Sequence, residues 1–253
     1  GTIWGGEFIL VDRIARKARR LAHLRKFPLP GGESAIRRTG RSALGALYAG
    51  GLMESPPCLS RLRSALGPET DQLPNLITAL DHRINAPVTS SAGRLFDAVA
   101  ALLGLCDRNH FEGQAGMAVE FAAADCPHSV AEFTYTLHPS QNGDGALEID
   151  WAPMLEELAS AAASGVPTPV LAMSFHKTLA GLIVDVARHF GIRTVALTGG
   201  CFQNAVLTNI TRDALIKARF DPLLHRRLPP NDNAIAAGQA LAAIWGFGRR
   251  TKD

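Results

Sequence analysis

The chain has 253 residues, of which 47% are hydrophobic, 19% charged and 6% aromatic. This composition excludes intrinsic disorder for the chain as a whole, because it supplies enough apolar surface for a core. The 26 basic and 23 acidic residues give a net charge of only +3. The basic clusters at residues 13–26 and 37–41 lack interleaved aromatic residues, so they indicate solvated faces rather than a nucleic-acid-binding surface.

Two further observations restrict the partners and the compartment. No uninterrupted apolar run approaches the roughly 18–20 residues of a membrane span, so we expect no membrane partner. Cys58, Cys106, Cys126 and Cys201 form no CxxC pair, and a chain of this size does not need disulfides. We therefore expect free thiols and a cytoplasmic location.

The first half of the chain is predicted to begin with strands and continue as helices. Residues 3–12 and 17–25 are rich in strand-forming residues and predict a hairpin. Gly5 and Gly6 in its first strand indicate a close backbone approach. Two prolines and two glycines predict a loop over 27–32. Helices are expected over 33–49, 57–66, 73–84, 93–103 and 111–124, with Ser90 and Ser91 as caps before the fourth and Gly104 ending it.

The second half alternates strands and helices. A turn over 141–145 leads to a short strand over 146–150, followed by helices over 153–163 and 169–190. A buried strand over 194–198, a helix over 203–219, a strand over 222–225 and an Ala-rich helix over 232–246 complete the pattern. This succession of strand, glycine turn, helix and strand predicts an α/β fold.

The segment TVALTGGCFQN is the strongest local signal for a binding site. Glycines at a strand-to-helix turn, here Gly199 and Gly200, allow a ligand to approach the backbone. The following helix N-terminus is expected to offer unpaired N–H groups and a positive dipole end, which suits a nucleotide phosphate. The amide of Asn204 is placed to bind a sugar or phosphate oxygen. The alternative is a tight turn in which Asn204 caps the helix, and the segment alone does not decide between the two.

Other polar residues favour structural interpretations when they are taken singly. Asp232 follows two prolines at the start of a helix, where a cap is favoured over a metal ligand. Asp97 is expected to pair with Arg94 at i−3, in preference to binding the hydroxyls of a ribose. His176 reads as a structural histidine and Cys201 as a small packing residue. No Ser/His/Asp or Cys/His order predicts a protein nucleophile.

Seven ordered segments together resemble the C-terminal carbamoyltransferase domain of the HypF family of nickel–iron hydrogenase maturation proteins. They are GTIWGGEFILVD, FPLPGGESAIR with RSALG, SSAGRLFDAVAALLGL, FEGQA, SFHKTLA, LTGGCFQNAVL and HRRLPPND. More distantly, the chain is similar to the tRNA threonylcarbamoyl-transferases and the nebramycin-type O-carbamoyltransferases. The resemblance implies an actin/sugar-kinase-like α/β fold with ribonuclease-H-like lobes around a nucleotide, here without its N-terminal part.

The resemblance also implies roles for individual residues. Asp97 contacts the ribose, Gly113 lies by the nucleoside, and Asp232 is a ligand of a divalent metal such as iron, zinc or magnesium. The remaining implied nucleotide-binding residues are Trp4, Gly5 and Gly6 at the phosphate and carbamoyl end, and Gly199, Gly200 and Asn204 in the glycine turn. Along the chain, hairpin strands are expected over 1–27, a mostly helical section over 28–165 and an α/β nucleotide-binding section over 166–253.

The implied reaction starts from carbamoyl-adenylate, which an upstream domain makes from carbamoyl phosphate and ATP. The carbamoyl group passes to the C-terminal cysteine thiolate of the partner HypE, and the resulting thiocarbamate is later dehydrated to the cyanide ligand of the hydrogenase iron. Because the acceptor brings its own thiolate, no protein nucleophile is needed. The alternatives are O-carbamoylation of a small molecule and a non-catalytic nucleotide-binding module.

The chain departs from the family pattern at several places. The family has an HxxxH pair upstream of the first strand and an aspartate directly before the Gly-Thr, so we expect Gly1 to lie inside the fold and the metal to bind only when those ligands are supplied. The acylphosphatase-like, zinc-finger and YrdC-like domains are expected as upstream partners. Asn233-Ala234 replaces Gly-Gly after Asp232, and Ala205 replaces arginine after Asn204.

Overall fold

The computed structural model describes residues 2–124, 126, 130–140 and 145–247. The strands are β1 (Glu7–Asp12), β2 (Lys17–Leu24), β3 (Phe27–Pro28), β4 (Val88–Thr89), β5 (Thr136–Pro139), β6 (Leu147–Asp150), β7 (Thr194–Ala196) and β8 (Asp221–Leu223). The α-helices are α1 (Glu33–Arg37), α2 (Thr39–Ala49), α3 (Pro56–Leu66), α4 (Leu73–Asp81), α5 (Ala92–Leu103), α6 (Gln114–Ala124), α7 (Ala152–Ala163), α8 (Thr168–Phe190), α9 (Ala205–Lys217) and α10 (Ile235–Ile244). Short 3₁₀ turns are η1 (Gly67–Gln72), η2 (Gly200–Gln203) and η3 (Asp232–Ala234).

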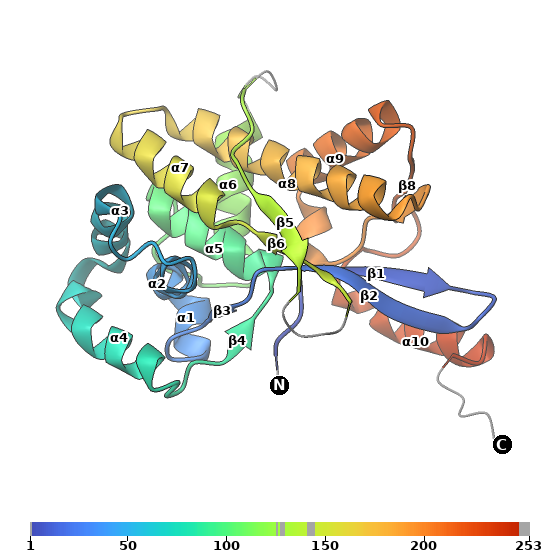
Figure 1. Cartoon of the computed structure of the whole chain (residues 1–253), viewed down its shortest axis with the longest axis horizontal. Helices are drawn as coiled ribbons and strands as arrows, with labels where there is room; N and C mark the ends of the chain where they lie inside the picture. The colour runs from blue at the N-terminus through green and yellow to red at the C-terminus, as the bar shows by residue number, and fades with distance from the viewer. Residues whose placement is uncertain (1, 125, 127–129, 141–144, 248–253) are drawn as a thin grey trace.

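The larger sheet has the strand order β1-β2-β6-β5. The predicted hairpin is confirmed: β1 and β2 pair antiparallel from Glu7 opposite His23 to Asp12 opposite Lys17. Asp12 stabilises the connection because its Oδ1 accepts from the N–H groups of Ile14 and Ala15. Only the second half of β2 is buried, so the tip of the hairpin projects away from the helices (Figure 1). Strand β6 pairs parallel with β2, and β5, which was not predicted, pairs antiparallel with β6.

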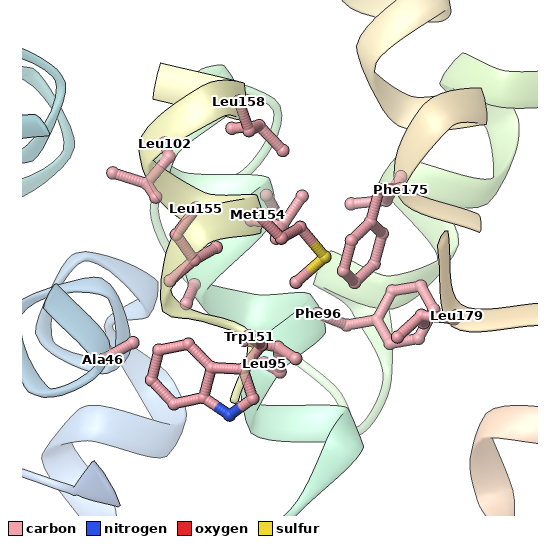
Figure 2. Packing of buried hydrophobic residues seen from close by; sticks show 14 of the residues in the cluster. Ala46, Leu95, Phe96, Leu102, Trp151, Met154, Leu155, Leu158, Phe175 and Leu179 are labelled. Carbon is pink, nitrogen blue, oxygen red and sulfur yellow. The ribbon is translucent and has the colours of Figure 1, made fainter. Parts of the chain in front are cut away.

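The core lies among the helices, with α5 and α8 at its centre. Figure 2 shows apolar side chains from α5, α7 and α8 packed together, including Phe96, Met154 and Phe175. Trp151 joins this core to the sheet, because its Nε1 donates to the Arg25 carbonyl at 3.0 Å and its ring meets Phe27 edge-on.

Helix α8 is apolar over most of its length. By length and composition alone it is long enough to cross a membrane, with a mean hydropathy of 1.5, yet 72% of that window is buried inside the structure. Such burial is typical of a helix that forms a protein core. Lys177 and Asp185 also interrupt it and bind partners within the protein: Lys177 Nζ donates to the Val130 carbonyl, and Asp185 accepts from the Tyr135 hydroxyl.

The smaller sheet consists of β7 and β8, which run parallel with α9 between them along the chain. The predicted α/β pattern is therefore present. The expectation of a buried strand at 194–198 is wrong in part: Thr194 and Ala196 are exposed and only Leu197, just after β7, is buried. The reason is that the two strands have no third neighbour among the described residues. A strand is buried on both faces only in a larger covered sheet.

Three further predictions need correction or fall outside the structure. The helix expected over 33–49 is broken at Arg38, whose extended backbone pairs with Arg108 and whose side chain contacts Glu69. The loop expected over 27–32 contains the short strand β3, which pairs with β4. The predicted turn at 141–145 is described only at Gly145, because residues 141–144 lie outside the described residues.

Candidate functional site around the N-terminus of α5

The N-terminal end of α5 is where most of the predicted site residues meet. The helix starts as predicted: Ser91 is the N-cap and its Oγ accepts from the Arg94 N–H, while Gly104 ends the helix in the left-handed conformation. Because the cap sets the direction of the helix, Arg94 and Asp97 lie on its first and second turns. The rest of α5 is buried in the core.

The Trp4-Gly5-Gly6 segment lies against this helix start. The Ser90 N–H donates to the Ile3 carbonyl at 3.0 Å, and the Ala92 N–H donates to the Gly5 carbonyl at 3.2 Å. A Cβ at Gly6 would stand closer than 3.0 Å to the Ser90 carbonyl oxygen, which real Cβ atoms do not tolerate. The predicted close backbone approach is therefore confirmed. The partner in that approach is the chain's own segment before α5.

Glu7 holds the two glycines in place, and sequence reasoning missed it. Its Oε2 accepts from the Gly5 N–H at 2.7 Å and the Gly6 N–H at 2.9 Å, while Ser90 Oγ donates to Oε1 at 2.5 Å. Two successive N–H groups around one carboxylate form an anion-binding concavity. The position of Glu7 directly after two glycines is visible in the sequence, whereas its hydrogen bond to Ser90 is not. Trp4 itself stays exposed, with the Arg20 guanidinium 4.5 Å above its ring.

Asp97 is the most buried acid among the described residues, with 1% of its surface exposed. Its Oδ1 accepts from Asn109 Nδ2 at 3.2 Å. Its Oδ2 lies 2.5 Å from Arg94 Nη1, which confirms the predicted ion pair. Neither atom of that pair has a partner with hydrogen-bond geometry. Burial raises the pKa of Asp97 to about 6, although Arg94 and Asn109 both act to lower it.

Asn109 connects Asp97 to the start of α6. Its Oδ1 accepts from the Ala115 N–H at 2.9 Å, and its Nδ2 also donates to the Ile36 carbonyl. Gly113 directly precedes α6 with a φ of 80°, and a Cβ placed on it would meet no atom within 4 Å. Gly113, the glycine expected beside the nucleoside, therefore borders open space. It lies one short loop after Asn109, the residue that binds Asp97. No motif in the sequence singles out Asn109.

The glycine turn at Gly199 and Gly200 also contacts the start of α5. A Cβ built on Gly93 would lie 4.0 Å from Cys201 Sγ, whereas a Cβ on either turn glycine would meet nothing within 4 Å. Gly199 adopts a φ of 103° and its N–H donates to the Pro230 carbonyl at 2.7 Å. Burial raises the pKa of the Cys201 thiol to about 11. Cys201 is thus protonated at neutral pH, as expected for a packing residue.

Asn204 faces the protein interior. Its Oδ1 accepts from the Leu207 N–H at 2.8 Å and caps α9, and its Nδ2 donates to His176 Nε2 at 2.8 Å. Glu120 Oε1 accepts from the Ala205 N–H at 2.7 Å. The expectation of unpaired N–H groups at this helix start is therefore wrong for Ala205 and Leu207, because side chains already bind them. The helix also begins two residues late, after η2.

His176 has the structural role that was predicted. Its Nδ1 donates to the Ala172 carbonyl at 2.7 Å, and its Nε2 accepts from Asn204. Burial lowers its pKa to about 4, so the ring is neutral at physiological pH. Both ring nitrogens are in use, which removes His176 as a general base.

Asp232 lies on the exposed start of η3, shortly after Pro230, whose carbonyl accepts from the Gly199 N–H of the glycine turn. The expected cap is off by one residue, because Asn231 is the N-cap and accepts from the Asn233 N–H at 3.2 Å. Across the described ranges, no three His, Cys, Asp or Glu side chains are grouped so that they could hold a metal ion. The described residues therefore do not fit a metal site by themselves.

Comparison with known proteins identifies the family. Residues 1–239 match the family described as "Carbamoyltransferase, Kae1-like Domain, second subdomain". Carbamoyltransferase HypF of a Synechocystis species is 39% identical over 256 residues, which cover 96% of this chain and 32% of the relative. A HypF homolog of Cupriavidus necator is 35% identical over 96% of this chain and 61% of its own length.

Two solved structures share the fold. Full-length HypF "in the phosphate- and nucleotide-bound form" superposes with a TM-score of 0.83 at 30% identity, over 96% of this chain and 31% of that one. HypF of T. kodakarensis gives a TM-score of 0.73 at 26% identity, over 97% and 32%. The chain spans about a third of the length of most relatives that it matches. The predicted actin/sugar-kinase-like fold is confirmed, and the chain belongs to the family formed by the second subdomain of the Kae1-like carbamoyltransferase domain of HypF proteins.

Proposed function

We propose that this chain forms the nucleotide-binding part of a HypF-type carbamoyltransferase. In this proposal carbamoyl-adenylate binds beside the N-terminus of α5, and its carbamoyl group passes to the C-terminal cysteine thiolate of HypE during synthesis of the hydrogenase cyanide ligand. The observation that carries the proposal is the buried Asp97 carboxylate, whose Oδ2 is paired with Arg94 but has no partner with hydrogen-bond geometry. A Cβ at Gly113, Gly199 or Gly200 would meet no atom within 4 Å, so these glycines leave open space.

The geometry suggests a task for each group. The Asp97 carboxylate accepts the ribose hydroxyls, and Arg94 compensates the negative charge of the carboxylate. Gly199 and Gly200 leave room for the phosphate, since no atom occupies the space where a side chain would start. The Gly5 and Gly6 N–H groups already bind one anion, the Glu7 carboxylate. A phosphate or carbamoyl oxygen at these amides displaces Glu7.

The proposed transfer needs no nucleophile from this chain. The acceptor sulfur attacks the carbamoyl carbon, the bond from that carbon to the phosphate oxygen breaks, and AMP leaves with the electron pair. Both nitrogens of His176 are occupied and Cys201 is protonated. A thiolate supplied by the acceptor therefore fits this site better than catalysis by either residue. Once Glu7 is displaced, the Gly5 and Gly6 N–H groups stabilise the negative charge that develops on the carbamoyl and phosphate oxygens.

Other parts of the proposed machinery lie with the partners. The upstream HypF domains supply the adenylate from ATP and carbamoyl phosphate, and they would also have to supply the ligands that a divalent metal needs besides Asp232. The four free cysteines support the cytoplasm as the proposed location.

Calorimetry with a non-hydrolysable carbamoyl-adenylate analogue tests the binding step. We expect the 253-residue chain to bind it, and Asp97→Asn to weaken binding at least tenfold, since the amide has one acceptor oxygen in place of two and carries no negative charge. Asp71→Asn, at an exposed acid in η1, is the matched control and keeps wild-type affinity. Equal affinity of all three proteins contradicts the proposed site.

A labelling experiment tests the reaction. The matching third of Synechocystis HypF is replaced by this chain, and the chimera is mixed with labelled carbamoyl phosphate, ATP and HypE. We expect label on the C-terminal cysteine of HypE, and no label when that cysteine is replaced by serine. Label on a sugar acceptor instead identifies an O-carbamoyltransferase, and analogue binding without any transfer identifies a non-catalytic module. Each of these outcomes contradicts the proposed acceptor.

A further inference from the structure

Three consecutive basic residues follow strand β8 and take no part in the site described above. His225 lies two residues after the end of β8, and Arg226 and Arg227 come directly after it. All three side chains are exposed. Neither arginine forms an ion pair or a side-chain hydrogen bond with another residue that the structure describes. We call these three residues the basic rim.

The pairing of β7 with β8 places the basic rim beside the glycine turn. The two strands run parallel with Ala196 opposite Leu223, so their carboxyl ends lie at the same edge of the sheet. Thr198 and His225 each lie two residues beyond that pair, and Thr198 Oγ1 is 3.0 Å from His225 Nε2. Ligands of open α/β sheets bind outside the carboxyl ends of the strands. The basic rim therefore begins where a ligand is expected.

The chain that follows the basic rim also contacts the glycine turn. The Pro230 carbonyl accepts from the Gly199 N–H at 2.7 Å. Residues 225–230 therefore run alongside the turn, from the contact with Thr198 to the contact with Gly199. A Cβ on Gly199 or Gly200 would meet no atom within 4 Å. The basic rim thus borders the open space that the proposed function assigns to the phosphate.

We propose that the basic rim binds the phosphate of the adenylate and stabilises AMP as it leaves. The inference rests on the proposed function and adds the residues that hold its phosphate. Charge supports it, because residues 222–247 contain no basic residue outside the rim and a single acid, Asp232. An arginine can donate two parallel N–H groups to phosphate oxygens. His225 adds a further donor from Nδ1 when the Thr198 hydroxyl donates to its Nε2.

The charge of the phosphate gives the basic rim a part in the transfer as well as in binding. The phosphate of carbamoyl-adenylate carries one negative charge. When the thiolate sulfur bonds to the carbamoyl carbon, the bond from that carbon to the phosphate oxygen breaks and its electron pair stays on the oxygen. The charge of the thiolate thus passes to AMP, whose phosphate leaves with two negative charges. Cations beside the phosphate attract the leaving group more strongly than the substrate, and they thereby lower the barrier.

Calorimetric titrations with AMP and with adenosine test the inference, because the two ligands differ only in the phosphate. We expect the wild-type chain to bind AMP more tightly than adenosine. The double variant Arg226→Gln/Arg227→Gln should bind AMP about tenfold more weakly and adenosine as the wild type does. His225→Gln should show a smaller loss that is likewise confined to AMP. Arg63→Gln, at an exposed arginine on α3 far from β8 in Figure 1, is the matched control and should change neither affinity.

Several outcomes overturn the inference. Equal AMP affinity of the wild type and the double variant shows that the basic rim does not bind the phosphate, and equal losses for AMP and adenosine show a structural effect. In both cases the wild type still binds nucleotide, so the proposed function stands. A wild type that binds neither ligand contradicts the proposed function and this inference together. In the Synechocystis chimera, the double variant should also slow the labelling of HypE at saturating ATP and carbamoyl phosphate, and an unchanged rate contradicts the role in transfer.

Discussion

The Asp97 carboxyl makes a quantitative prediction about stability, because burial raises its pKa from 3.8 to about 6. Between these values the folded protein keeps the proton and the unfolded chain releases it. The unfolded state therefore binds fewer protons, and the free energy of unfolding falls as the pH rises. The contribution is fully present below about pH 4 and is lost as the pH passes through 6.

The size of the effect follows from the two pKa values. A shift of about two units at roughly 1.4 kcal/mol per unit is about 3 kcal/mol. Asp97→Asn removes the titrating group. The free energy of unfolding of the wild type, measured relative to that of this variant, should therefore fall by about 2–3 kcal/mol between pH 4 and pH 7. Any constant offset, such as the cost of leaving Arg94 without its acid, cancels from this comparison.

Urea denaturation followed by circular dichroism at pH 4, 5, 6 and 7 measures the difference. Asp71→Asn in η1, where the acid is exposed, controls for the loss of one carboxylate. A difference between the wild type and Asp97→Asn that stays constant with pH refutes the reasoning, because it means that burial does not hold the proton on Asp97. Binding of the adenylate analogue should show the opposite trend and weaken below pH 6, since the neutral acid is a poorer acceptor for hydroxyl groups.

Four further predictions concern Gly6, Glu7, Asn204 and Asp232. Gly6→Ala should destabilise the protein by about 1–3 kcal/mol in thermal denaturation, because its Cβ meets the carbonyl of the segment before α5; an unchanged midpoint contradicts the close packing. Glu7→Ala should cost about 1–2 kcal/mol by leaving two amides unpaired, whereas Glu7→Gln should keep most of the stability; equal losses would count against the clamp. Asn204→Ala should lower the free energy of unfolding by about 1–3 kcal/mol, since it removes the α9 cap and a hydrogen-bond partner of His176. A variant that loses helical signal without losing stability would contradict this role. Titration of the separate chain with Zn²⁺ or Mg²⁺ should give the same result for the wild type and Asp232→Asn, because one exposed carboxylate is not a metal site; a difference would show a site that the structure does not contain.

Local chemistry alone was sufficient for a good part of the fold. The caps of α5 at Ser91 and Gly104, the β1–β2 hairpin and the Arg94–Asp97 pair all depend on residues that lie close together in the sequence. Such features follow from local backbone preferences and from helical or strand spacing. The order of seven short segments was likewise enough to indicate the family, although no single segment was.

Contacts between distant segments decided the rest. Glu7 binds Ser90, which is 83 residues away, and Asn204 binds His176, 28 residues away. Glu120 takes an amide at the start of α9 that was expected to be open. No periodicity or propensity encodes such pairs, because each one depends on where the packing of helices brings a side chain.

The division is clearest for the two glycine pairs. The sequence by itself determined that no side chain occupies the space beside the backbone at Gly5–Gly6 and at Gly199–Gly200. Such a space is either filled by the close approach of another segment or left open. Only the tertiary structure decided which of the two applies. The space beside Gly6 is filled by Ser90 and Leu24 of the same chain, whereas the space beside Gly199 and Gly200 is open. The physical reason is that a missing side chain creates room, and the elements packed around that room determine what occupies it.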